Sequence, residues 1–417
     1  MGERASAQQP TGGWASKKMG AMGAPVDTTK VDTSKVFHRF DSAYLRHQVD
    51  LIDIFLYILG KDPSKRLIHH PGQTRLHVSA APSLAYALST GLSVNLTGNA
   101  AFYLAHDSAT ALSEVLLSLA VTQSQQLIVP LQSSIWTKDN KYNFVGDWRY
   151  LEFPEKTYGL GGHTTLNDAY ELNYNYARFY QYVLRKVAKD LYLGPGYQLD
   201  IHYDIQQLGL TPGEVTPFDT YGYSPTSVSS GVALNLLYDT RQNSINPEGG
   251  SFYGNVIFRQ NLRALGSDQN WSSLLVDIRK YFSLPGKSQN VLAFWSYDWF
   301  TLSGTPPYLD LPSTGWDTYD NTGRGYVQSR FRSKNMLDLE GEYRFGILRN
   351  GLIGGVVFAN AESFSDVGTG KFDVLSPAVG AGLRIKFNKF SKTNICIDYA
   401  WGTGGSQGLF LNLGEVF

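Results

Sequence analysis

Apolar and polar residues alternate with a period of two along most of this chain, most clearly in the segment 335–345. If its backbone is extended, successive side chains point to opposite faces. One face is then apolar and the other charged: Leu337, Leu339, Tyr343 and Phe345 against Asp338, Glu340, Glu342 and Arg344. Burying unpaired carboxylates in an apolar core costs on the order of several kcal/mol each. The pattern therefore favours a strand between lipid and a polar lumen, as in a membrane β-barrel.

With this segment included, the same alternation predicts sixteen strands along the chain. They span residues 80–89, 91–104, 113–122, 126–138, 143–153, 171–187, 191–206, 227–241, 251–265, 270–283, 289–303, 334–347, 351–364, 374–387, 393–402 and 408–417. Most exceed the roughly nine to eleven residues that a tilted strand needs to cross a membrane. An even strand number is typical of bacterial barrels. The sequence thus predicts an all-β fold, a 16-stranded antiparallel transmembrane β-barrel in residues 76–417.

The connections between these strands differ in length. Short turns are predicted at 139–140, 284–287, 349–351 and 388–394, and long loops at 154–170, 207–226 and 304–333. In outer-membrane barrels, short turns face the periplasm and long loops face outward.

The loop at 304–333, the sixth on the outer side, carries Arg324 between Gly323 and Gly325. Glycine lets a backbone adopt conformations that other residues avoid, and a buried guanidinium needs carboxylate partners. We therefore expect this loop to fold into the lumen. The carboxylates available for pairing with Arg324 are Asp338, Glu340, Glu342 and Asp398.

Residues 1–75 lack the strand pattern. Residues 1–35 are rich in small and polar side chains and are predicted to be a flexible leader. Ala5-Ser6-Ala7 is similar to the end of a secretory signal peptide, either as a remnant or by accident.

Residues 36–75 are predicted to form a periplasmic amphipathic helix and a linker. The apolar side chains at helical spacing are Phe37, Phe40, Tyr44, Ile52, Phe55, Leu56 and Leu59. This helix is expected to pack on the barrel mouth, to lie in the membrane interface or to contact a second copy of the chain.

Composition and charge narrow the class of protein. The chain has 42 glycines and 26 tyrosines, and only 17% of its residues are charged. No apolar run reaches the roughly 18 residues of a transmembrane helix. Because the formal net charge is zero and no basic run occurs, nucleic acid is not an expected partner. The single cysteine, Cys396, excludes an intrachain disulfide and is predicted to be an inert thiol facing the lumen.

Patterns associated with catalysis and metal binding lack the necessary context. Residues 404–408 spell G-x-S-x-G, but between two predicted strands instead of a strand and a helix. His69-His70, and His202 with Asp204, have no third ligand at suitable spacing. We therefore expect no enzymatic activity, no catalytic residue, no bound metal and no cofactor.

Four segments resemble the outer-membrane protein insertase and translocase superfamily, which includes BamA, TamA and surface-antigen-type barrels. They are Gly323-Arg324-Gly325-Tyr326, residues 238–250, residues 153–161 and residues 341–345. The resemblance covers roughly residues 76–417. Family members usually carry POTRA domains before the barrel, and residues 31–75 are too short for one. The resemblance therefore implies a POTRA-less branch.

The resemblance also implies a function in the outer membrane of a Gram-negative bacterium. In such barrels the first and last strands meet in a weak seam, whose opened edges can pair with a strand of a client protein. The corresponding residues here are Ser83, Leu88, Leu409, Leu411, Leu413 and Phe417. The expected role is assembly or translocation of outer-membrane or surface proteins. Expected partners are outer-membrane lipids, unfolded clients and accessory periplasmic or lipoprotein subunits.

Two other functions remain open at this point. The chain could be a structural or scaffold subunit of an outer-membrane complex, or a passive pore. A lumen plugged by residues 304–333 would argue against the pore, because it would block free diffusion of solutes.

Overall fold

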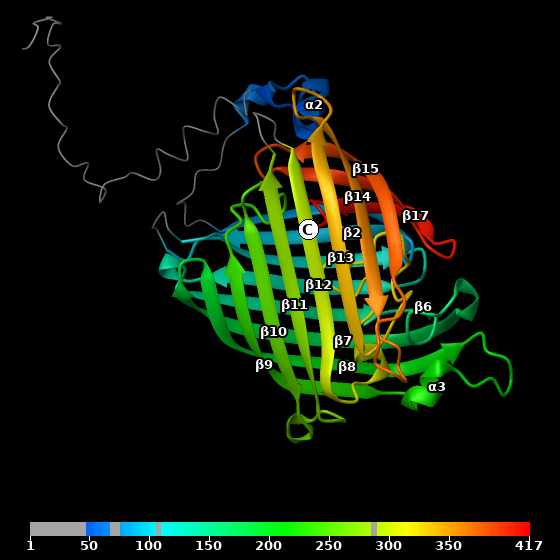
Figure 1. The fold of residues 1–417 in the computed structure, drawn as a ribbon. Coiled ribbons are helices and arrows are strands. Elements are labelled where there is room, and N and C mark those ends of the chain that lie inside the picture. The colour runs from blue at the N-terminus through cyan, green and yellow to red at the C-terminus, as the bar shows by residue number, and fades with distance from the viewer. Residues whose placement is uncertain (1–46, 67–75, 106–109, 285–289) are drawn as a thin grey trace, which may run out of the picture. The chain divides into compact units, whose positions relative to one another are not determined.

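One antiparallel sheet dominates the computed structural model, which describes residues 47–66, 76–105, 110–284 and 290–417 (Figure 1). Its strands are β1 His77–Ala87, β2 Gly91–Phe102, β3 Ser113–Thr122, β4 Leu127–Trp136, β5 Tyr142–Glu152, β6 Glu155–Thr157, β7 Tyr170–Ala188, β8 Leu191–Leu208, β9 Ser227–Asp239, β10 Phe252–Asn261, β11 Trp271–Ser283, β12 Val291–Gly304, β13 Asn335–Gly346, β14 Ile353–Phe364, β15 Ser376–Asn388, β16 Thr393–Gly402 and β17 Gln407–Leu413. The α-helices in these ranges are α2 Leu51–Ile58 and α3 Pro217–Gly222. Neither has the length and apolar character to cross a bilayer.

Neighbours in sequence are neighbours in the sheet, and every pairing is antiparallel. β5 and β6 both pair with β7 and are separated only by Phe153 and Pro154, so they share one position in the strand order. The all-β antiparallel fold predicted from the alternation is therefore observed. Most strand bounds differ from the predicted ones by one to three residues.

The hydrogen-bonded sheet does not close on itself in the described residues. β1 pairs with β2, and β17 pairs with β16, but the two end strands share no ladder. They nevertheless lie side by side, with Cα atoms within 8 Å of each other. A Cβ atom placed on Gly408 would come within 2.6 Å of Leu88 Cγ. The ends of the sheet therefore meet without pairing.

The two faces of the sheet have the polarity of a membrane barrel. In β13, Leu339 is 60% exposed on the outside, whereas Glu340 and Glu342 are buried on the inside. Water-soluble proteins show the reverse arrangement, with apolar side chains inside and carboxylates outside. Such an outward apolar face is the arrangement found in barrels whose solvent is lipid.

The predicted last strand, 408–417, is too long. β17 ends at Leu413, and Gly414 has a φ of +95°, which turns the chain into the lumen. Phe417 is therefore buried, with its ring centroid 5.2 Å from that of Trp295, and does not share the outward face of Leu413. The polar residue Glu415 already interrupts the apolar alternation at the position where the strand should continue outward.

The predicted helix over 36–59 is also corrected in part. Residues 48–50 are not helical, and α2 begins after Asp50, whose carboxylate accepts a hydrogen bond from the backbone N–H of Asp53 at 2.7 Å. Ile52, Phe55 and Leu56 belong to α2, and Leu59 is its C-cap. The leader 1–35 and the helix residues Phe37, Phe40 and Tyr44 lie outside the described residues.

Connections at the two ends of the sheet differ in length. One end carries residues 158–169, 209–226 and 305–334, and we call it the long-loop end. The other carries residues 189–190, 347–352 and 389–392, and we call it the short-turn end. Residues 305–334, which join β12 to β13, are called loop 6.

Candidate functional site

Loop 6 is polar, yet much of it is buried inside the sheet. Its buried polar and charged side chains include Asp310, Ser313, Thr314, Asp317, Thr322, Arg324, Ser329, Arg330, Arg332 and Ser333. Buried polar groups are stable only if they find hydrogen-bond partners. The site is therefore defined by the partners that the strands supply to this loop.

Arg324 is the central anchor of loop 6, and its side chain is 2% exposed. Its Nη1 lies 2.8 Å from Asp398 Oδ2 on β16, and its Nη2 lies 2.5 Å from Glu342 Oε2 on β13. Nη2 also contacts Glu340. The guanidinium carbon lies 3.7 Å from the ring centroid of Phe358, so the cation also faces an aromatic ring. Arg324 thus ties the loop to strands on both sides of β14 and β15.

Two further arginines stabilise the carboxylates around Arg324. Arg344 contacts Glu342, and Arg384 lies 2.5 Å from Asp398. Arg384 also lies 2.7 Å from Glu415, just after β17. The anchor is therefore a charge network that reaches the end of the sheet.

The residues that flank Arg324 explain the glycine-rich motif. Gly323 has a φ of +71° and Gly325 a φ of +112°, a region that favours glycine. A Cβ atom on Gly323 would come within 2.6 Å of the Glu362 carboxylate. Tyr326 completes the motif, because its hydroxyl donates to the Pro377 carbonyl at 2.8 Å. All four residues of the motif 323–326 thus either contact the lumen wall or allow the backbone to approach it closely.

Of the four carboxylates predicted to pair with Arg324, Asp338 does not. Neither oxygen of Asp338 has a hydrogen-bond partner among the described residues. Asp338 lies opposite Glu362 of β14, one step nearer the long-loop end than Glu340. The guanidinium of Arg324 reaches past this level to Glu340 and Glu342. The alternation placed all these carboxylates on the lumen face but could not fix the depth of the loop.

A second anchor of loop 6 was not predicted. Arg332 Nη2 lies 3.3 Å from Glu155 Oε1 on β6, and the Ser329 hydroxyl donates to Glu155 Oε2 at 2.6 Å. The Tyr174 hydroxyl donates to the same carboxylate at 2.9 Å. Glu155 lies within the resembling segment 153–161, so the sequence contained a signal for its importance but not for its partner.

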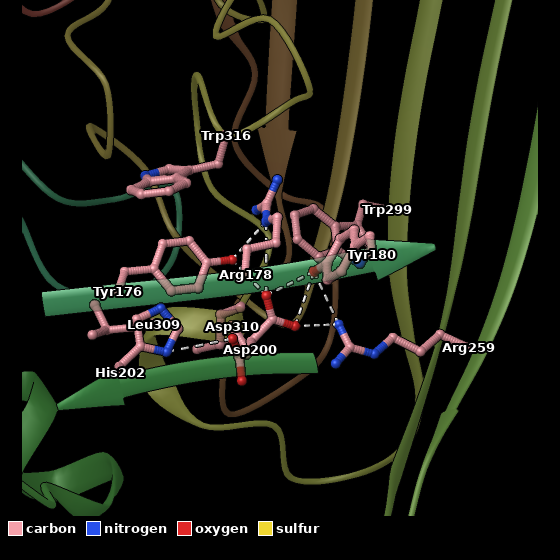
Figure 2. Close-up of a pocket in the computed structure, with 11 residues that line it drawn as sticks. Tyr176, Arg178, Tyr180, Asp200, His202, Arg259, Trp299, Leu309, Asp310 and Trp316 are labelled. Atoms are coloured by element: carbon pink, nitrogen blue, oxygen red, sulfur yellow. Dashed lines mark hydrogen bonds and ion pairs between the residues drawn. The ribbon is translucent and has the colours of Figure 1, made fainter. Parts of the chain in front are cut away.

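A third group of contacts joins Asp310 of loop 6 to His202 of β8 and Ser229 of β9. Figure 2 shows Asp310 beside side chains of β7, β8 and β10 that line one small cavity. Asp200 lies 2.6 Å from Arg259, and Asp310 of loop 6 accepts a hydrogen bond from the Ser229 hydroxyl at 2.5 Å. Burial, reinforced by the nearby Asp200 carboxylate, raises the pKa of Asp310 to about 7. The cavity holds about 20 Å³, enough for a single water molecule. This group is therefore a docking contact and not a substrate pocket.

The predicted seam residues other than Phe417 lie in or next to the two end strands, whereas Phe417 turns into the lumen and is not part of the seam. Ser83 is in β1 and pairs with Asn95 of β2, and Leu88 lies one residue after β1. Leu409 and Leu411 are in β17 and pair with β16. Their free backbone edges face the gap between β1 and β17.

These features define a class of protein. It is an antiparallel barrel with an apolar exterior, with first and last strands that do not pair with each other, and with a loop anchored inside by an arginine. No family model and no curated protein matches the sequence.

Solved structures with this fold include BamA from Haemophilus ducreyi lacking POTRA domains 1–3, with 14% identity over 82% of this chain and 70% of that chain, at a TM-score of 0.54. CdiB from Escherichia coli matches with 9% identity over 84% of this chain and 63% of its own, at a TM-score of 0.52. The chain therefore has the fold of the BamA and CdiB type of outer-membrane barrel.

Proposed function

We propose that this chain is an outer-membrane barrel that assists the insertion or translocation of other proteins through the seam between β1 and β17. The carrying observation is that the two end strands lie side by side without a shared ladder. Unpaired strand edges are templates for another strand, which gains backbone hydrogen bonds by adding to them. A client strand would enter the sheet at this position.

Loop 6 supports this proposal because it occupies the lumen and is linked to the seam. Arg324 contacts β13 and β16, and its network continues through Arg384 to Glu415 beside β17. A lumen filled by an anchored loop does not suit a passive pore. We propose a non-enzymatic role without a cofactor, in which a client strand forms backbone hydrogen bonds with the strand edges at the seam.

The proposed location and partners follow from the same features. The apolar exterior would face outer-membrane lipids, and the seam would receive unfolded outer-membrane or surface proteins. Accessory periplasmic or lipoprotein subunits would deliver these clients.

A disulfide across the seam tests the function directly. Leu88 and Gly408 are adjacent, so the double variant Leu88→Cys, Gly408→Cys in a Cys396→Ala background should crosslink under oxidation. We expect the oxidised protein to lose the ability to insert a denatured client barrel into vesicles, and reduction to restore it.

A matched control places the same crosslink away from the seam. Leu96 of β2 pairs with Leu119 of β3, so Leu96→Cys with Leu119→Cys forms a bridge inside the continuous sheet. This variant should stay active when oxidised. Full insertion activity of the seam-locked protein would contradict the proposal. If depletion from cells removes only bound partners and not client barrels, the scaffold alternative would replace it.

A further inference from the structure

Helix α2 is fixed to the short-turn end of the sheet by its N-terminal residues (Figure 1). The Val49 N–H donates to the Asn350 carbonyl at 3.0 Å, in the turn between β13 and β14. Asp50 accepts a hydrogen bond from the Lys389 N–H at 2.8 Å, and Asp53 lies 2.7 Å from Lys389 Nζ, in the turn between β15 and β16. The start of the helix is therefore held by two neighbouring turns.

The second half of α2 has an apolar surface that these contacts leave uncovered. Four large side chains are more than half exposed: Phe55 at 61%, Tyr57 at 78%, Ile58 at 73% and Leu59 at 52%. Phe55, Ile58 and Leu59 share one side of the helix because they are three and four residues apart. A contiguous exposed apolar patch of this kind marks an interaction surface.

This patch begins where the outward apolar rows of the sheet end. On β15, Leu383 and Phe387 face outward, and Phe387 lies two residues before Lys389. After β13, Ile347 and Leu348 are exposed and lie in the same turn as Asn350. The helix is held by these same turns at residues 49–53, so its apolar patch, which starts at Phe55, lies close to the edge of the lipid-facing surface.

Charged and aromatic residues around the patch fit a lipid headgroup region. Lys61, just after α2, and Arg349, in the turn that holds the helix, are both exposed. Long cationic side chains at an apolar boundary reach toward lipid phosphates. Tyrosine, as at Tyr57, is enriched at membrane interfaces because its ring is apolar and its hydroxyl polar.

We propose that residues 55–59, the second half of α2 and its C-cap, lie in the lipid headgroup region of the bilayer that surrounds the barrel and bind its anionic lipids. This inference rests on the membrane location in the proposed function, and it adds a contact surface outside the barrel wall. Short apolar helices of this kind bind a membrane surface without crossing it.

Depth-dependent fluorescence quenching tests the inference. Single-cysteine variants Ile58→Cys, Leu339→Cys and Val215→Cys, each in a Cys396→Ala background, are labelled with a small environment-sensitive fluorophore. They are reconstituted in vesicles of phosphatidylethanolamine and phosphatidylglycerol whose acyl chains are brominated near the headgroup. Leu339 is the reference for the lipid-facing wall, and Val215, 74% exposed in the loop between β8 and β9, is the reference for water.

We expect the probe at Ile58 to be quenched at least half as strongly as the probe at Leu339, and several-fold more than the probe at Val215. Replacing phosphatidylglycerol with phosphatidylcholine should reduce quenching at Ile58 but not at Leu339. Quenching at Ile58 equal to that at Val215, with Leu339 still quenched, would overturn the inference and leave the membrane barrel intact. Absence of quenching at Leu339 as well would instead overturn the proposed membrane location.

Discussion

Replacing Arg324 with alanine is the most direct perturbation of the lumen site. The change removes a guanidinium that contacts Glu340, Glu342 and Asp398, all of them buried. Glu342 keeps Arg344 and Asp398 keeps Arg384, so these two carboxylates remain paired. Glu340 loses its ion pair, because Arg324 is its salt-bridge partner and its Oε2 has no partner among the described residues.

The expected magnitude follows from these contacts. Breaking a buried ion pair by removing one partner costs about 3–5 kcal/mol. Two of the three carboxylates keep an arginine partner. We therefore expect the variant to lose about 3 kcal/mol of the free energy that docks loop 6, the lower end of this range. Since about 1.4 kcal/mol is a factor of ten, this predicts an increase of roughly 100-fold in the population of undocked loop.

Limited proteolysis of loop 6 in the purified protein measures that population. When opening and closing are fast relative to cleavage, the cleavage rate follows the free energy of local opening. We therefore expect Arg324→Ala to be cleaved within residues 305–334 about 100 times faster than the parent protein. Its heat-modified mobility on gels should also change.

A matched control uses an arginine outside the lumen. Arg263 lies in the connection between β10 and β11. Among the described residues its side chain donates to the Asp268 carbonyl and the Gln269 side chain of its own loop, and its backbone N–H donates to Asn270. Arg263→Ala should change stability by less than about 0.5 kcal/mol. If Arg324→Ala is cleaved no faster than Arg263→Ala, the anchoring role assigned to Arg324 is wrong.

Three further predictions use the same proteolysis assay together with thermal unfolding. The pKa of Asp310 is raised to about 7, from about 3.9 in an unfolded chain. The protonated Asp310 carboxyl therefore stabilises the docked loop fully below about pH 4, and this stabilisation is lost as the pH rises to 7. Asp310→Asn should flatten the increase in loop opening between about pH 4 and 7, and an unchanged slope would refute this. Phe417→Ala should destabilise the protein by about 3 kcal/mol, far more than Leu413→Ala on the exposed face, and equal effects would refute the inward turn. Gly323→Ala should accelerate cleavage at least tenfold, because its methyl group would meet the Glu362 carboxylate and φ is +71°; unchanged cleavage would show that the loop relaxes freely.

The sheet could be predicted from the sequence because strand alternation is a local property. Each window of about ten residues shows which face is apolar, independent of the rest of the chain. The inward turn after Leu413 was missed because the leucines before it continue the alternation, and the strand was extended past Glu415 to the aromatic Phe417. The break at residues 48–50 was missed because the apolar helical spacing continues across it, while the Asp50 cap is a single residue.

The partners of loop 6 were harder to predict, because they depend on how deep the loop enters. The lumen face of β13 repeats carboxylates at Asp338, Glu340 and Glu342, and every one of them is a plausible partner by composition alone. The partner of Arg332 is more distant still, since Glu155 precedes it by 177 residues in the chain. Only the fold brings these two together.

The inward tail, loop 6 and the seam form one connected unit through specific bonds. Arg344 contacts Glu342, the partner of Arg324, and donates to the Phe417 carbonyl at 2.7 Å. The Asn321 side chain of loop 6 donates to the Val416 carbonyl at 2.7 Å. The tail that follows β17 is thus bound by the loop and by the network that anchors it. Since one edge of the seam is β17, loosening the loop removes contacts that fix the tail directly after this edge.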